Sequence, residues 1–184
     1  MLFALLVSVA LVGSAGAGDD GVCTLTAADL LANAKLSFWN FDQTGTTPST
    51  ARALANRSCY SEAAAATENF MLLHAPLKNG ERIILLFHEG QYRAMAGEEH
   101  VAAMLIAASK DLGQKPSDPL DWNTYVDGTW AFLTNDRSML DAASEKLSAE
   151  RGRGNIMNAR VLHGLQACFG HPYKEAYSSK CFTH

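Results

Sequence analysis

Residues 85–109, LLFHEGQYRAMAGEEHVAAMLIAAS, decide the predicted fold of this 184-residue chain. Apolar residues recur in them at three and four positions, which is the spacing of an amphipathic helix. Gly97 interrupts the pattern. Glu98 and Glu99 follow it, and acidic side chains favour the first turn of a helix. The stretch therefore predicts two antiparallel helices that are joined at Gly97.

Capping and breaking residues predict helices along most of the chain. Thr26 is expected to cap a helix that runs to about Asn40, and Pro76 to end an Ala-rich helix. Asp118 precedes a proline, a combination that is typical of a helix start. Strand signals are nearly absent, so the sequence predicts an all-α fold.

Further breaks complete this pattern. The pair Asn135-Asp136 is expected to cap a helix over 137–150, and the residues RGRGN at 151–155 to end it. The pair His171-Pro172 is expected to begin a final short helix. Two stretches are predicted to be irregular loops, 41–50 and 111–118.

Small residues recur in pairs across the predicted turns. Gly90 and Ala102 lie twelve positions apart on either side of Gly97. Small side chains at such positions let two helices approach closely. The same spacing, or one close to it, occurs in the pairs Ala51–Ala63, Gly128–Ala142 and Gly164–Ala176. In chain order the second members are Ala63, Ala102, Ala142 and Ala176, and the intervals between them are 39, 40 and 34 residues. This recurrence predicts stacked helical hairpins.

This repeated pair, with Tyr60 or Tyr173 three residues before its second member, resembles the tetratricopeptide repeat. The resemblance covers roughly residues 48–182. It implies a right-handed solenoid of about four degenerate helix-turn-helix units after one extra N-terminal helix. The Trp expected near the start of each first helix is missing. The segments FWNFDQ, LLFHEGQYRAMAG and WNTYVDGTWAFL are also similar to uncharacterised exported bacterial proteins of this type, which implies a fold rather than an activity.

The N-terminal residues predict export. An apolar run followed by small residues up to Ala17 is typical of a secretory signal peptide at 1–17, cleaved before Gly18. An uncleaved anchor is the alternative, because no Lys or Arg precedes the run. Residues 18–184 are of single-domain size, and we expect a periplasmic or secreted protein without membrane insertion after cleavage. The formal net charge of −4 offers no basic surface for nucleic acid.

The chain contains four cysteines, all after the predicted signal peptide. An even number of cysteines in an exported chain is typical of disulfides. Three pairings of Cys23, Cys59, Cys168 and Cys181 are possible. We favour Cys23–Cys59 and Cys168–Cys181, since each would tie a terminal segment to a nearby element.

The residues His88 and Glu89 do not begin a zinc-protease motif, because Tyr92 stands where the second His would be needed. His88 and His100 would be separated by roughly 9 Å along antiparallel helices at about 1.5 Å per residue. We therefore predict neither a metal nor a cofactor. For Asp42, which lies among aromatic residues, the favoured role is a hydrogen bond to a neighbouring helix.

The repeat resemblance implies a concave groove lined by the first helix of each unit. Its predicted lining mixes aromatic, amide and charged side chains, as peptide-binding grooves do. The predicted groove residues are Phe87, Gln91, Thr124, Asp127 and Val161, with His88 and Asn123 at the border and His163 facing the interior.

These observations favour an exported module that binds a protein or peptide partner. The alternative is a small secreted hydrolase or ligand-binding enzyme with a pocket near His88, Asp127 and His163. A third hypothesis is an immunity-type inhibitor of a toxin. No catalytic set is assembled in the sequence itself.

Overall fold

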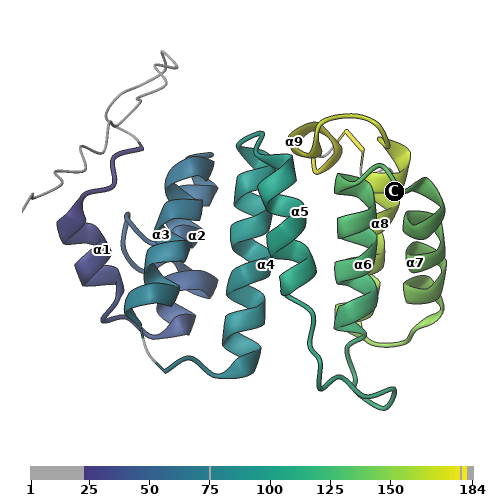
Figure 1. Cartoon of the computed structure of the whole chain (residues 1–184), viewed down its shortest axis with the longest axis horizontal. Helices are drawn as coiled ribbons and strands as arrows, with labels where there is room; N and C mark the ends of the chain where they lie inside the picture. Colours follow the sequence, from purple (N-terminus) through teal and green to yellow (C-terminus); the bar gives the residue numbers. More distant parts are fainter. Residues whose placement is uncertain (1–22, 75, 179, 182–184) are drawn as a thin grey trace, which may run out of the picture.

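The computed structural model describes residues 23–74, 76–178 and 180–181, and within them the chain is all-α without a β-strand. The predicted all-α class is therefore confirmed, whereas the predicted signal peptide lies outside the described residues. The helical segments are α1 (Ala27–Asn33), η1 (Trp39–Thr44), α2 (Ala51–Asn56), α3 (Tyr60–Leu73), α4 (Asn79–Met95), α5 (Glu99–Ala108), α6 (Trp122–Leu133), α7 (Arg137–Ala149), α8 (Arg153–Ala167) and α9 (Tyr173–Ala176) (Figure 1).

Consecutive helices pack side by side, with α2 on α3, α4 on α5, α6 on α7 and α7 on α8 (Figure 1). The turn between α4 and α5 shows why the chain reverses there. Gly97 has a φ of 89°, in the region that favours glycine. Its amide donates to Ala94 O and the amide of Glu98 donates to Arg93 O, at 3.0 and 2.8 Å. These two bonds satisfy the last carbonyls of α4, so the predicted hairpin at Gly97 is confirmed.

Small residues do mark close helix approaches. A Cβ at Gly90 would lie 3.2 Å from the carbonyl oxygen of Ala102, its predicted counterpart. A Cβ at Gly128 would lie 3.2 Å from the Cβ of Ala143, whereas Ala142, the predicted counterpart, is exposed. The predicted pair in α6 and α7 was therefore wrong by one residue.

The first predicted helix is shorter than expected. Thr26 caps it as predicted, in a capping box with Asp29, but α1 ends at Asn33 rather than near Asn40. The buried side-chain amide of Asn33 donates to Ser49 O at 2.8 Å and so holds the loop beside the helix end. Helical structure resumes in η1, a π-helical turn, so the first residues of the predicted loop 41–50 are helical.

The apolar side chains form two clusters, and α4 contributes to both. Leu85 and Tyr92 pack in the first cluster with Phe41, Leu54 and Phe70. Phe87 packs in the second, together with residues of α5 to α9 that include Ile106, Tyr125, Leu162 and Tyr173. Opposite faces of one helix therefore join the N-terminal and C-terminal halves of the molecule.

Both predicted disulfides are confirmed. Cys23 is bonded to Cys59, at the start of α3, and Cys168 is bonded to Cys181 after α9. Each bridge ties a terminal segment to the helical body, as the cysteine positions indicated. Two disulfides suggest that the protein folds in an oxidising, extracytoplasmic environment.

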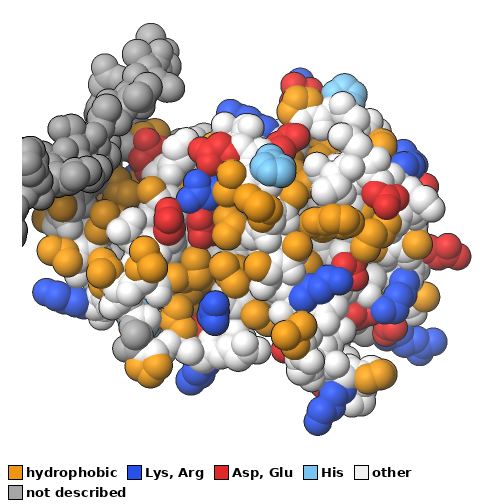
Figure 2. Space-filling view, viewed as in Figure 1, with side chains coloured by type: hydrophobic (Ala, Val, Ile, Leu, Met, Phe, Trp, Pro, Cys, Tyr) orange, Lys and Arg blue, Asp and Glu red, His pale blue; other side chains and the backbone are white. Residues whose placement is uncertain are grey.

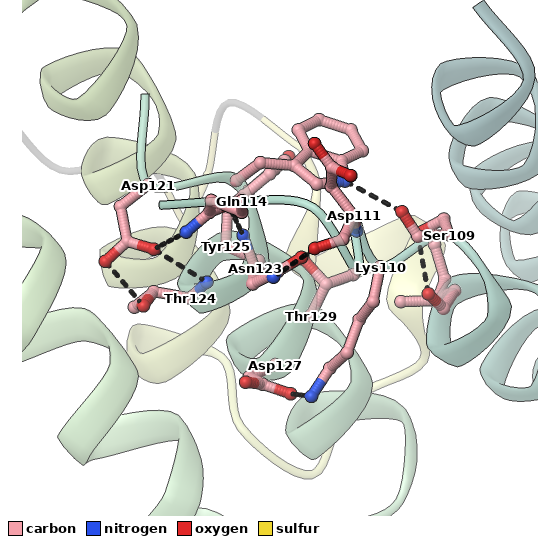
Figure 3. Close-up of polar contacts among 12 residues, drawn as sticks. Ser109, Lys110, Asp111, Gln114, Asp121, Asn123, Thr124, Tyr125, Asp127 and Thr129 are labelled. Carbon is pink, nitrogen blue, oxygen red and sulfur yellow. Dashed lines mark hydrogen bonds and ion pairs between the residues drawn. The ribbon is translucent and has the colours of Figure 1, made fainter. Parts of the chain in front are cut away.

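The connection between α5 and α6 is irregular, as predicted for 111–118, and polar side chains hold it (Figure 3). Asn123 accepts from the amide of Asp111 and donates to its carbonyl, both at 2.8 Å. Gln114 accepts from the amide of Asn123 and donates to Asp121. Asp121, not the predicted Asp118, caps α6 by accepting from the amide of Thr124.

The starts of α7 and α8 can also be compared with their predicted positions. Of the predicted pair Asn135-Asp136, Asp136 caps α7 by accepting from the amide of Met139. The RGRGN segment is only partly a break, because α8 begins at Arg153. The chain turns at Gly152, whose φ is 123°. A side chain would be strained at that angle, so this one glycine is sufficient for the break.

Candidate functional site

A carboxylate–imidazole pair joins η1 to α4. The Nδ1 atom of His88 lies 2.9 Å from both side-chain oxygens of Asp42, which is fully buried. The Gln43 side-chain amide also donates to Asp42, and the Arg52 Nε donates to its main-chain carbonyl. The hydrogen bond to a neighbouring helix that was predicted for Asp42 is therefore present.

This pair fixes the orientation of one imidazole. Asp42 binds Nδ1, and 19% of the His88 side chain is exposed. An imidazole held in this way can accept or deliver a proton. A π-helical turn such as η1 is rare and is often found at functional sites.

Tyr92 lies one helical turn after His88, with the two rings 6.3 Å apart. Its hydroxyl is buried and has no hydrogen-bond partner among the described residues. Burial raises the pKa of Tyr92, so the hydroxyl stays protonated at neutral pH. Tyr92 therefore supplies no ionised oxygen beside His88.

Two predicted groove residues on α4 face other helices of the same chain. Phe87 is 1% exposed and packs against the rings of Trp122 and Tyr125. Gln91 donates to the hydroxyl of Tyr173, on α9, at 3.1 Å. The side chain of Gln91 is therefore engaged by the short helix α9 of the same chain.

Two predicted groove residues on α6 also have structural partners. Thr124 is buried, and its hydroxyl donates to Asp121 and accepts from Lys146. Asn123 holds the α5–α6 connection described above (Figure 3). Their side chains therefore stabilise the start of α6.

The two predicted residues on α8 lie apart from the others. Val161 is half-buried against the second apolar cluster. His163 is exposed, and its Nε2 lies 3.0 Å from the hydroxyl of Ser148 on α7. His88, Asp127 and His163, which were predicted to share a pocket, thus each have a different partner.

Asp127 lines a hollow of about 300 Å³ between α5, α6 and α7. It forms an ion pair with Lys110, whose side chain extends toward it (Figure 3). The other lining residues, Ala107, Trp130 and Met139, are apolar. This arrangement of an aromatic wall with a charged pair can receive an apolar side chain and orient the chain that carries it.

The helix beside this hollow has an apolar surface. After Glu99, α5 contains no Asp, Glu, Lys or Arg, yet its side chains at Val101, Met104, Ala107 and Ala108 are exposed. Met104 alone is 55% exposed. Figure 2 shows hydrophobic side chains gathered over the middle of the face where Figure 1 places α4 and α5. A surface helix usually carries charged side chains on its solvent side, so this face is typical of a contact surface.

We call the residues Val101, Met104, Ala107 and Ala108, together with the adjoining hollow, the α5 face. Sequence analysis missed it, apart from Asp127, because periodicity identified α5 as a helix without showing how many of its sides the neighbours cover. The absence of charge after Glu99 was the available signal.

A metal site has little support in the part of the chain that the structure describes. The three side chains close enough to share an ion there are Cys23, Cys59 and Glu62, and the two sulfurs are bonded to each other. Glu98 instead forms an ion pair with Arg93, and Glu99 accepts from the amide of Tyr173. Both acids therefore have structural roles.

Comparisons with protein-family models, curated proteins and solved structures find no match for this chain. The likeness to the tetratricopeptide repeat thus rests on residue spacing. None of the helices in the described ranges is both long and apolar enough to cross a bilayer.

Proposed function

We propose that this protein is an exported binding module that engages a segment of a protein partner on the α5 face. The observation that carries the proposal is the exposure of Val101 and Met104 on a helix without charge after Glu99. Water in contact with such a face is released on binding, which is the main favourable term in protein association.

The adjoining hollow supports a polypeptide partner. Its apolar walls, Trp130 and Met139, suit an aliphatic side chain, while Lys110 and Asp127 can bond to the backbone next to it. Anchored aromatic or aliphatic side chains with a few polar groups around them dominate the energy of protein interfaces. Methionine side chains such as Met104 adapt to different partner shapes.

We extend the proposal to the architecture and the location. The paired helices are consistent with a right-handed, tetratricopeptide-like solenoid of about four units, with α1 as the extra helix. The predicted signal peptide and the two disulfides support a periplasmic or secreted protein. In such a solenoid α9 would cover the concave side along α4, which leaves the α5 face as the contact surface.

Site-specific photo-crosslinking tests the binding function. A photo-reactive amino acid at Ala107, on the α5 face, is compared with one at Ala142, which is exposed on α7. We expect one reproducible polypeptide to crosslink at Ala107 and not at Ala142. The crosslink should be lost when Trp130→Ala removes a wall of the hollow. Identical products at both positions would contradict the proposal.

The contact between the His88 imidazole and the buried Asp42 carboxylate, at 2.9 Å, favours a second function, which is acid–base chemistry at this pair. The alternative of a small hydrolase predicts that His88→Ala abolishes turnover of a substrate while Asp42→Asn reduces it. We expect both variants also to weaken the fold, so activity must be measured where each is fully folded. An immunity-type inhibitor differs from the leading proposal only in its partner, which would be a toxin.

A further inference from the structure

We propose that the Cys168–Cys181 disulfide is a thiol-exchange site for anionic thiols, and that its opening loosens α9. This site is separate from the α5 face and from the pair of Asp42 and His88. The group that opens a disulfide is a thiolate, which is negatively charged. The charges around the sulfurs therefore help to set the rate of attack, and the two bridges of this chain differ in those charges.

A hollow with a positive charge borders the C-terminal bridge. Cys168 and Cys181 both line this hollow, whose volume is about 670 Å³. Lys174 and Lys180 line it as well, and neither forms an ion pair with another residue that the structure describes. The Lys174 ammonium lies 5.5 Å from the centre of the Tyr60 ring, a contact that leaves its charge in place.

One acid lines the same hollow. It is Glu175, whose carboxylate lies 3.2 Å from the Nδ1 atom of His171, also a lining residue. The two lysines outnumber this acid whether or not His171 is protonated. The hollow therefore carries a net positive charge, which attracts an approaching thiolate.

The N-terminal bridge has the opposite surroundings. A carboxylate oxygen of Glu62 lies within 4.8 Å of the sulfurs of both Cys23 and Cys59. Glu62 has no ion-pair partner within the described ranges, so its charge repels a thiolate there. Each bridge joins one half-buried cysteine, Cys23 or Cys168, to a buried one. Access to the two bridges is therefore similar, and charge is the main difference between them.

The exchange is a displacement at sulfur. The thiol first loses its proton to water, and its sulfur then attacks the Sγ atom of Cys168, the more exposed cysteine of the bridge. As the new S–S bond forms, the bond to Cys181 breaks, and its electron pair passes to the Cys181 sulfur, which takes up a proton from water. The products are a mixed disulfide on Cys168 and a free thiol at Cys181. No further oxidant or reductant is needed.

The bridge closes the loop that contains α9. This helix has only four residues, so it has little stability of its own. It is held to the helical body partly by Tyr173, whose amide donates to Glu99 at 2.7 Å and whose hydroxyl accepts from Gln91. Opening the bridge removes a covalent restraint on this loop. We therefore expect α9 to separate from α4 more often once the mixed disulfide has formed.

Competition between the two bridges of one molecule tests the electrostatic preference. The mature chain is treated with reduced glutathione, whose net charge is negative, or with cysteamine, which carries an ammonium group. Alkylation and mass spectrometry follow each bridge. We expect glutathione to open Cys168–Cys181 at least about tenfold faster than Cys23–Cys59. This ratio of rates should fall with cysteamine, and added salt should reduce the difference between the two thiols. A ratio that is equal for both thiols would overturn the proposal.

Neutral variants identify the charges responsible. Lys174→Gln combined with Lys180→Gln should slow the glutathione reaction at Cys168–Cys181 by at least about threefold without slowing that of cysteamine. Glu62→Gln should accelerate the glutathione reaction at Cys23–Cys59. Lys115→Gln is the matched control, because Lys115 is exposed in the α5–α6 connection, at the opposite end of the molecule from α9 (Figure 1). A double lysine variant that reacts like the control would contradict the role of the hollow.

Hydrogen exchange tests the loosening of α9. The chain that carries glutathione on Cys168 is compared with the untreated chain. The amides of Tyr173 and Tyr177, which donate to Glu99 and to Tyr173 O, should exchange faster after the reaction. The amide of Asp136, which donates to Ala131 O in the α6–α7 turn, should not change. Unchanged protection of Tyr173 and Tyr177 would overturn the effect on α9, whatever the rate of exchange at the bridge. None of these outcomes depends on binding at the α5 face.

Discussion

The imidazole Nδ1 of His88 lies 2.9 Å from both carboxylate oxygens of Asp42, a side chain without exposed surface. The two residues are 46 positions apart, so the contact holds η1 against α4. A buried carboxylate is stable only when its charge is compensated by hydrogen bonds or by a cation. Removing either partner would therefore leave a buried polar group uncompensated.

We expect His88→Ala to lower the free energy of unfolding by about 3 kcal/mol, because it leaves the Asp42 carboxylate buried without its main partner. Urea denaturation measures the change. Adding Asp42→Asn to this variant should recover part of the loss, since a neutral amide costs less to bury. His163→Ala, at an exposed imidazole, should change stability by less than about 0.5 kcal/mol. Equal losses at the two histidines would argue against a buried charge at Asp42.

Gly128→Ala should destabilise the protein although alanine favours a helix. The new Cβ would lie 2.6 Å from the Cδ1 of Leu162, whose side chain is itself buried. Overpacking of this kind costs about 1–3 kcal/mol, which exceeds the gain in helix propensity of about 1 kcal/mol. Gly80→Ala is the matched control, because nothing lies within 4 Å of its Cβ position. Thermal unfolding should show a lower melting temperature for Gly128→Ala alone.

The helices could be predicted because their signals are local, and the disulfides because each favoured pairing ties a terminal segment to a nearby element. Gly97 ends α4 through its own backbone angle, and the approach of Gly90 to Ala102 follows from the short turn between them. The end of α1 at Asn33 was missed because its cause is a bond to Ser49, sixteen positions away. No periodicity within one helix contains that information.

The candidate site could be predicted less well. Phe87 was assigned to a groove, but the docking of α6 buries it, and α9 likewise engages Gln91. Hydrophobic spacing identifies the faces of a helix without showing which neighbour covers each one. The partnership of Asp42 with a specific histidine was likewise beyond reach, because only tertiary packing brings η1 and α4 together.

Acid should weaken the protein partly through Asp121. Burial raises the pKa of this carboxyl, but hydrogen bonds from Lys146, Thr124 and Gln114 outweigh it and lower the pKa to about 2. The unfolded chain then binds more protons than the folded one between the two pKa values. The stabilisation is therefore present above about pH 4 and is lost as the pH falls through 2. After discounting for solvent screening, it amounts to about 1–2 kcal/mol.

Asp121→Asn tests this dependence. The amide keeps the shape of the capping side chain but does not titrate, so the variant should lose stability relative to wild type at pH 6 and less so near pH 2. Unfolding in urea at a series of pH values measures the difference. Asp136→Asn, at the cap of α7, serves as the comparison. A constant difference between wild type and Asp121→Asn across this range would exclude the proposed titration.

Arg93 should contribute more to the free energy of unfolding than an ordinary surface cation does, because it neutralises a buried acid. Its Nε lies 2.7 Å from Glu89, whose side chain is 4% exposed, and its other nitrogens bind Glu68 and Glu98. Arg93→Ala should cost about 3–5 kcal/mol, since the Glu89 carboxylate is left buried and unpaired. Arg137→Ala removes only an exposed pair with Asp141 and should cost less than about 1 kcal/mol.

The pH dependence of Arg93→Ala identifies the cause. Burial already raises the pKa of Glu89 despite the opposing effect of Arg93, so removing the arginine should raise it further. A carboxyl with a raised pKa binds its proton more readily in the folded than in the unfolded chain, and stability then increases as the pH falls. The deficit of Arg93→Ala should therefore shrink between pH 8 and pH 5, and adding Glu89→Gln should remove this dependence. A deficit that does not vary with pH would instead indicate lost packing of the arginine side chain.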